Sequence, residues 1–144
     1  MSEKAKENRR IVERFINELI LGGNLNVLDD LCHPDLVNHA AAPGNQNGLD
    51  GIRKVIGFSL SAMPDQRWTD QIVVADDEHV VVRTVRTSTW QADSFRGVST
   101  PSGLPIAVEM VHIWRISEGK IAEHWAVRDD LGMMQQLGAL ESPG

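Results

Sequence analysis

The stretch of sequence that decides the fold is 111-VHIWRISEGKIAEHWAVRDDLGMMQQLG-138, in which two segments of alternating character flank a turn. In the first segment His112 falls in an apolar row, because side chains along a strand alternate between its two faces. Gly119 can adopt the positive φ that a tight hairpin turn requires. In the second segment His124 shares its face with two alanines, and the opposite face takes Ile121, Glu123, Trp125 and Val127. This pattern predicts a hairpin with both histidines on one face, where we expect a pocket.

Helical periodicity precedes strand periodicity along the chain. Apolar residues at spacings of one, three and four predict amphipathic helices at 3–21, 25–31 and 49–63. From residue 67 onward, alternation predicts strands at 67–75, 79–92, 104–116 and 121–127. Asp129 and Asp130 can begin a final helix, which Gly138 ends. The order of elements predicts one α+β domain over residues 1–144, in which a curved antiparallel sheet wraps around the helices.

Two segments rich in turn-forming residues interrupt this pattern, and both are expected near the pocket. The segment Ala40–Gly48 is rich in Ala, Asn, Gly and Pro, and we interpret it as the candidate lid. The segment Asp93–Gly103 contains too many turn residues for a continuous strand, so it is predicted to be a loop or a bulged edge at the pocket mouth. The identity of a ligand depends on how these two segments fold over the opening.

Composition excludes several classes of protein. The 144 residues allow one domain with a core and a modest pocket. A net charge of -6 argues against a nucleic-acid partner, because phosphate binding depends on clustered lysine and arginine. No window approaches the roughly 20 apolar residues of a membrane span. The charged N-terminus lacks the apolar core of a signal peptide and Cys32 is the single cysteine, so we expect a cytoplasmic protein.

Short motifs in the closing part of the chain are shared with a known family. In order they are His112-Ile-Trp-Arg-Ile, Gly119-Lys120-Ile121, Glu123-His124-Trp125, Asp129 and Gln136-Leu137-Gly138. With the order of elements, they resemble the SnoaL-like polyketide cyclases, often labelled ester cyclases, of the nuclear-transport-factor-two-like superfamily. The resemblance implies a cone-shaped, cystatin-like α+β roll with N-terminal helices packed in a curved mixed or antiparallel sheet. It also implies a small hydrophobic molecule as partner and a homodimer or homotetramer.

The resemblance implies where acid/base chemistry takes place. His112 matches a pocket histidine of the characterised cyclases, and His124 matches a neighbouring one. The aspartate that those cyclases use as acid/base falls at Ala126, which has no proton to exchange. Either another group has taken over, or the reaction differs, or the pocket only binds a ligand. The candidates for takeover are, in order, His112, His124 and, if the strand end curls inward, Asp129.

Ring closure of the cyclase type is an intramolecular aldol reaction that needs neither a metal nor a cofactor. A base removes a proton from carbon, the enolate attacks a ketone, and a proton returns to the new alkoxide. We expect His112 to be the base, kept neutral by apolar neighbours because desolvation lowers a histidine pKa. His124 would donate to the developing oxyanion. Substrate contacts are predicted for His39, Met110, Trp114 and Ala126.

Other interpretations of the same residues stay open. A histidine on an apolar strand face is commonly a hydrogen-bonded core residue, and a pocket without an acid/base suits a non-catalytic carrier or sensor. An isomerase or dehydratase could use His112 or Asp70. No pair of histidines has zinc-type spacing, so no metal site is predicted. Ser102 lacks the sequence of a nucleophile elbow.

The face of the sheet opposite the histidines has its own pattern. Charged residues there are predicted to form ion pairs with a second subunit: Glu109, Arg115 and Glu123. Ile113 and Trp125 could supply the apolar centre of that contact. Arg83 and Arg86 fall on opposite faces of their strand, so at most one of them points toward the pocket.

Overall fold

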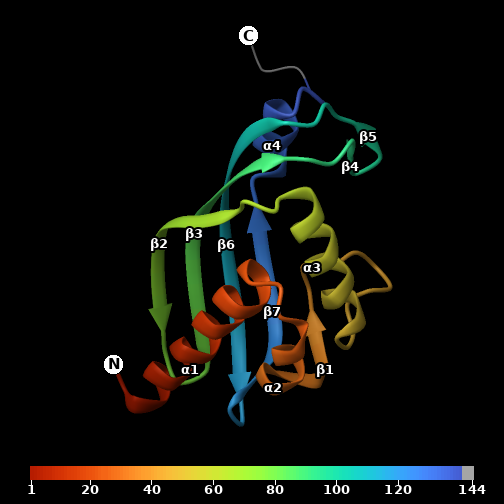
Figure 1. Ribbon diagram of the computed structural model, residues 1–144. Coiled ribbons are helices and arrows are strands. Elements are labelled where there is room, and N and C mark those ends of the chain that lie inside the picture. The colour runs from red at the N-terminus through yellow and green to blue at the C-terminus, as the bar shows by residue number, and fades with distance from the viewer. Residues whose placement is uncertain (141–144) are drawn as a thin grey trace.

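The computed structural model describes residues 1–140, and Figure 1 shows helices packed across one face of a bent sheet. The five strands of this sheet are β1 (Cys32–Asn38), β2 (Arg67–Ala75), β3 (His79–Trp90), β6 (Leu104–Ser117) and β7 (Lys120–Arg128). Their order is β1-β7-β6-β3-β2. β1 pairs with β7 in parallel, and every other neighbouring pair is antiparallel. The predicted α+β architecture with a curved mixed sheet is confirmed.

The helices follow the predicted periodicity, with one change of helix type. Helix α1 (Glu3–Arg14) begins at Ser2, whose hydroxyl oxygen accepts a hydrogen bond from the backbone N–H of Ala5 at 3.0 Å. The chain continues as a π-helix, η1 (Phe15–Leu21), which a search for 3.6-residue periodicity does not distinguish from an α-helix. The remaining helices are η2 (Leu25–Val27), α2 (Leu28–Leu31), α3 (Asp50–Ala62) and α4 (Asp130–Gln136). Within residues 1–140, no helix combines the length and apolar character needed to cross a membrane.

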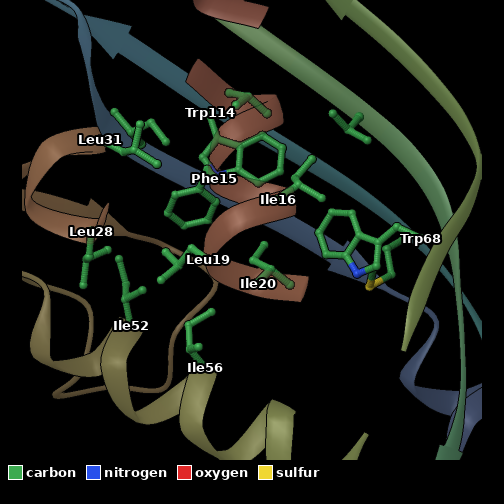
Figure 2. Packing of buried hydrophobic residues seen from close by; sticks show 14 of the residues in the cluster. Phe15, Ile16, Leu19, Ile20, Leu28, Leu31, Ile52, Ile56, Trp68 and Trp114 are labelled. Atoms are coloured by element: carbon green, nitrogen blue, oxygen red, sulfur yellow. The ribbon is translucent and has the colours of Figure 1, made fainter. Parts of the chain in front are cut away.

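The apolar core fills the space between the sheet and the helices. Figure 2 shows it built from η1, α2, α3 and the inner face of the sheet, with the labelled side chains of Phe15, Ile16, Leu19, Ile20, Leu28, Leu31, Ile52, Ile56, Trp68 and Trp114. Leu19 and Leu28 have no exposed surface. Phe15 meets Trp114 edge to face, with ring centroids 5.9 Å apart. The N-terminal helical segment is thereby fixed against β6.

A bulge in the hairpin of β6 and β7 changes which side chains face the helices. Arg115 pairs with Glu123 across the two strands. The next pair is Ile116 with Ile121, so β7 contains one extra residue at Ala122. Ile121 therefore points inward and has no exposed surface, and its predicted outward position was wrong. Strict alternation fails here because an extra residue reverses the facing of every position beyond it.

A second irregularity lies in β2. The register of β2 against β3 shifts between Thr69 and Ile72, and Asp70 within the shift has a φ of 52°. Trp68 before the shift is buried, whereas Ile72 after it is 58% exposed. A continuous strand over 67–75 would put Trp68, Asp70 and Ile72 on one face, and the shift breaks that alternation.

The segment predicted as a loop or bulged edge at 93–103 contains a small hairpin of β4 (Ser94–Phe95) and β5 (Val98–Ser99). Figure 1 shows it at the same end of the sheet as α4. Arg96 and Gly97 form its turn with φ values of 49° and 78°. At its base, the indole N–H of Trp90 donates to the hydroxyl oxygen of Thr100 at 3.0 Å. This buried hydrogen bond fixes the hairpin that carries Arg96.

Candidate active site

A cavity of about 400 Å³ lies on the inner face of the sheet, beside α3 and the segment after β1. His112 and His124 both line it, as do Trp68 and Trp114. Three consecutive alanines of the segment predicted as a lid, 40–42, form part of its wall. The hairpin of β6 and β7 and the strand β2 thus bring together two imidazoles and two indoles around one hollow.

The two histidines form a hydrogen-bonded chain with Asn38 at the end of β1. Nδ1 of His112 lies 2.9 Å from Nε2 of His124. Nδ1 of His124 lies 2.8 Å from Oδ1 of Asn38. The same Oδ1 accepts the backbone N–H of Ala40 at 3.1 Å, which identifies that atom of the amide as the oxygen.

This arrangement fixes the tautomer of each ring. Because Oδ1 of Asn38 is an acceptor, Nδ1 of His124 is the donor, and Nε2 of neutral His124 carries a lone pair. Nδ1 of His112 therefore donates to that lone pair, and Nε2 of His112 is left unprotonated. Among residues 1–140, Nε2 of His112 has no hydrogen-bond partner. The chain ends in a free basic nitrogen on a residue that lines the cavity.

Burial keeps both rings neutral. It lowers the pKa of His112 well below the ordinary value of 6.5, and the charges of His124, Arg128 and Arg86 act in the same direction. Burial also lowers the pKa of His124 to about 4, helped by the charges of Arg128 and His39. At neutral pH the pair therefore has the proton arrangement that the hydrogen bonds require.

Aromatic side chains hold the His112 ring from its faces. The ring stacks on Trp68 with centroids 4.8 Å apart and on Trp114 with centroids 5.2 Å apart. His124 also stacks on Trp114, at 5.2 Å. The imidazoles therefore have little rotational freedom, and their orientation is set before a ligand enters.

Polar atoms without partners gather around this cavity. Within residues 1–140, six buried side-chain nitrogen or oxygen atoms have no hydrogen-bond partner. Five of them belong to residues that line the cavity: Gln66 Oε1, Trp68 Nε1, Arg86 Nε, His112 Nε2 and Trp114 Nε1. Each such group costs roughly 1–3 kcal/mol when it is buried unpaired. Their concentration around one hollow indicates a site for a ligand with both donors and acceptors.

The cavity wall also carries positive charge. Arg86 of β3, Arg96 of the β4–β5 hairpin and Arg128 of β7 all line it, and no carboxylate from residues 1–140 does. Asp130 at the start of α4 bridges two of the guanidinium groups. Its Oδ2 lies 2.5 Å from Nη2 of Arg96, and its Oδ1 lies 3.9 Å from Nε of Arg128. Of the two arginines that the sequence left open, Arg86 is thus the one that points inward.

The predicted substrate contacts divide into two groups. Trp114 lines the cavity, while Met110 is buried on the same face of β6 outside the cavity wall. Ala126 pairs directly with His112 across the hairpin, but its short side chain does not reach the wall. The predicted substrate contact of His39 was wrong. Its side chain lies on the outer face, where Nε2 of the ring is 2.7 Å from Oε2 of Glu123. Alternation explains this, because His39 follows the inward-facing Asn38.

Two carboxylates predicted as alternative acid/base groups lie away from the cavity. Asp129 is exposed and caps α4, where its Oδ1 accepts the backbone N–H of Gly132 at 2.9 Å. The strand end therefore does not curl inward at Asp129, and that prediction was wrong. Asp70 is exposed and paired with Arg83 at 3.0 Å on the outer face. Neither side chain lines the cavity beside His112.

Several site residues were missed by the sequence analysis, above all Asn38, Trp68 and Gln66. Asn38 could have been found, since it shares the face of buried Leu36 on a short strand. Trp68 and Gln66 carried no local signal, because their place in the wall depends on how β2 lies against the rest of the sheet. Within residues 1–140, no group of three His, Cys, Asp or Glu side chains is placed to hold a metal ion.

Comparison with known proteins agrees with this architecture. The family model for SnoaL-like polyketide cyclases matches residues 10–137. A search of curated proteins found no match. TsrD from Streptomyces laurentii is 26% identical, with a TM-score of 0.82 over 97% of this chain and 99% of that one.

Two further solved structures are similar along most of the chain. IdmH from Streptomyces antibioticus, a proposed polyketide cyclase, is 29% identical, with a TM-score of 0.76 over 91% of this chain and 98% of that one. A proposed polyketide cyclase from Acidithiobacillus ferrooxidans is 25% identical, with a TM-score of 0.77 over 96% of this chain and 99% of that one. The family match spans nearly the whole of the described fold, including both histidines and the strands around the cavity. The chain therefore belongs to the SnoaL-like polyketide cyclase family.

Proposed function

We propose that the protein is a cofactor-independent cyclase that closes a ring in a small hydrophobic carbonyl compound, with His112 as the general base. The observation that supports this most is the chain from Asn38 through His124 to His112, which ends in the unprotonated Nε2. A neutral imidazole in a hollow lined by aromatic rings suits proton abstraction from carbon beside a carbonyl group.

The proposed reaction has three steps. Nε2 of His112 removes a proton from the carbon next to a carbonyl group and becomes protonated. The resulting enolate carbon attacks a second carbonyl carbon of the same molecule, which forms the carbon–carbon bond and leaves an alkoxide. The alkoxide takes the proton back from His112, so no atoms are lost and the base is regenerated.

The low pKa of His112 makes it a weak base on its own, and the arginines compensate for this. Arg86 and Arg128 are among the causes of the lowered pKa. The same positive charges stabilise a negatively charged enolate in a site of low dielectric constant. The charge that opposes protonation of His112 thus favours the other product of the proton transfer.

Solvent deuterium exchange tests this function. The probe is 1-phenylhexane-1,5-dione, and NMR in deuterated buffer follows both exchange beside its carbonyl groups and closure to the six-membered ring. We expect the wild-type protein to accelerate exchange and closure over buffer, and His112→Gln to lose the acceleration while keeping the same far-ultraviolet circular dichroism. Rates equal to those in buffer, or undiminished in the variant, would contradict the proposal.

A second candidate is a non-catalytic small-molecule binding protein, favoured by Ala126 at the position where the cyclases have an aspartate. An isomerase or dehydratase on this fold would have to use His112, since Asp70 is exposed on the outer face. Binding without exchange in the deuterium experiment would select the carrier.

The homodimer or homotetramer stays a prediction, as does the cytoplasmic location. The charges expected to pair with a second subunit are paired within the chain, Arg115 with Glu123 at 2.7 Å and Arg83 with Glu109 at 2.8 Å. Apolar side chains that remain exposed include Val127, at 75%. Sedimentation velocity measures the oligomeric state directly.

A further inference from the structure

Arg86 differs from Arg83, the other arginine on β3, in how its charge is balanced. Its buried Nε has no hydrogen-bond partner among residues 1–140, and its Nη2 reaches the sulfur of Met133 at 3.8 Å. Arg83 lies three residues earlier on the outer face and is paired with two carboxylates, Asp70 at 3.0 Å and Glu109 at 2.8 Å. Arg86, which points inward, thus lacks the paired carboxylates that Arg83 has on the outer face.

The surroundings of Arg86 add further positive charge. Arg128 and Arg96 line the same cavity, and Asp130 bridges these two rather than Arg86. Three guanidinium groups therefore share one carboxylate at this end of the cavity. Burial of Arg86 lowers its pKa to about 10, and the charge of Arg128 adds to the effect. A buried cation is costly unless it is paired, so this cluster is suited to an incoming anion.

The shape of the cluster restricts the kind of anion. A guanidinium group presents a planar fork of donors that matches the two oxygens of a carboxylate. The neighbouring wall includes Trp68 and Trp114, whose buried indole N–H groups have no partner among residues 1–140 and can donate to carbonyl oxygens. The remaining wall near α3 is apolar, with Ile52, Val55 and Ile56.

We propose that the cavity takes an apolar carbonyl compound that carries a carboxylate, held by Arg86 with Arg128 while its carbonyl oxygens lie beside the indole N–H groups of the tryptophans. The inference rests on the proposed function for the identity of this cavity as the substrate site, and it adds the substrate class. A bound carboxylate would also offset the arginine charges that disfavour protonation of His112 and His124, which makes His112 a stronger base in the complex than in the free protein.

The test compares two probes of nearly equal shape, 2-naphthoate and 2-naphthamide, by isothermal titration calorimetry. We expect the wild-type protein to bind the carboxylate on the order of 10- to 100-fold more tightly than the amide, because a charged hydrogen-bond pair replaces a neutral one. Arg86→Met keeps most of the apolar length of the side chain and should abolish that preference. Arg83→Met, on the outer face of the same strand, is the matched control and should keep it.

Two further variants and the results that overturn the inference complete the test. Arg128→Gln provides a second removal of positive charge if Arg86→Met does not fold, and it should reduce the preference in the same direction. Equal affinity of the wild-type protein for the two probes overturns the inference. A failure of both probes to bind overturns it as well. His112→Gln should keep the preference for 2-naphthoate, so a failure of the proposed catalysis is distinguishable from a failure of this carboxylate site.

Discussion

The imidazoles of His112 and His124 are joined from Nδ1 to Nε2 at 2.9 Å, and Asn38 at the other end of the chain sets the direction of the donors. The relationship links three strands, because β1, β7 and β6 contribute one residue each. The basic nitrogen of His112 thus depends on an amide that is two side chains away. Predictions about this site can therefore be made for Asn38, which acts on His112 through His124.

Asn38→Leu tests that dependence. Without the acceptor on Asn38, His124 can adopt either tautomer, and Nε2 of His112 is protonated in a fraction of the molecules. We expect kcat to fall about 10- to 100-fold with KM nearly unchanged, since residues that orient a reacting group through a hydrogen bond commonly have effects of this size. Asn38→Asp retains an acceptor and should restore orientation while raising the pKa of His124, which moves the limb of the pH-rate profile upward. A KM effect alone in Asn38→Leu would contradict the positioning role.

Ala126→Asp places a carboxylate opposite His112, at its cross-strand partner position. A negative charge there should raise the pKa of His112 and make it a better base, so we expect kcat/KM for ring closure to increase by about tenfold or more. Ala126→Asn has a similar size without the charge and is the matched control. An increase in both variants would indicate a change of shape rather than of charge.

The buried histidines make stability sensitive to mild acid. The pKa of His124 is about 4 in the folded protein and about 6.5 when unfolded, so the unfolded state binds more protons between these values. Stability is therefore complete above about pH 6.5 and falls as the pH decreases toward 4. For His124 alone the loss between pH 7 and pH 5 is about 2 kcal/mol, and His112 adds to it.

Urea denaturation at pH 7 and at pH 5 measures this loss. His124→Gln removes one of the two titrating groups and should show a smaller difference between the two pH values. Carboxylates with lowered pKa, such as Asp65 and Asp76, affect stability only in more acidic solution, because they take up a proton at a lower pH than the unfolded histidines do. Equal stability of the wild-type protein at both pH values would show that the rings are not buried neutral.

Thr100→Val tests the anchor of the β4–β5 hairpin. The change removes the acceptor for the indole N–H of Trp90, a buried donor, and should reduce the free energy of unfolding by about 1–3 kcal/mol. Because the hairpin carries Arg96, we expect faster hydrogen exchange over 94–99 as well. Thr89→Val, at a position whose hydroxyl bonds exposed Asp65 instead, should leave exchange in the hairpin unchanged.

The hairpin with two inward histidines could be predicted from the sequence because alternation along a strand is a local property. The outward position of His39 follows from the same rule once Asn38 is seen to share the face of Leu36. The facing of Ile121 could not be predicted, since a bulge depends on pairing with a second strand. The facing of Asp70 could not be predicted either, because the register shift in β2 depends on its pairing with β3.

The arginine cluster lay beyond prediction for a different reason. Arg86, Arg96 and Arg128 come from three separate places, which are β3, a hairpin turn and the end of β7. Their meeting depends on the register between strands and on how the hairpin at 94–99 folds over the sheet. Neither property is contained in the residues that surround any one of the three.

The extra residue at Ala122 divides β7 into a part near the turn and a part beside the cavity. If the turn became one residue longer or shorter, the bulge at Ala122 would take up the change. The side chain of His124 would then keep its direction toward the cavity. The tip of the hairpin is therefore a suitable place to graft a foreign loop or an affinity label in protein engineering, while the cavity end of the same strand keeps its orientation.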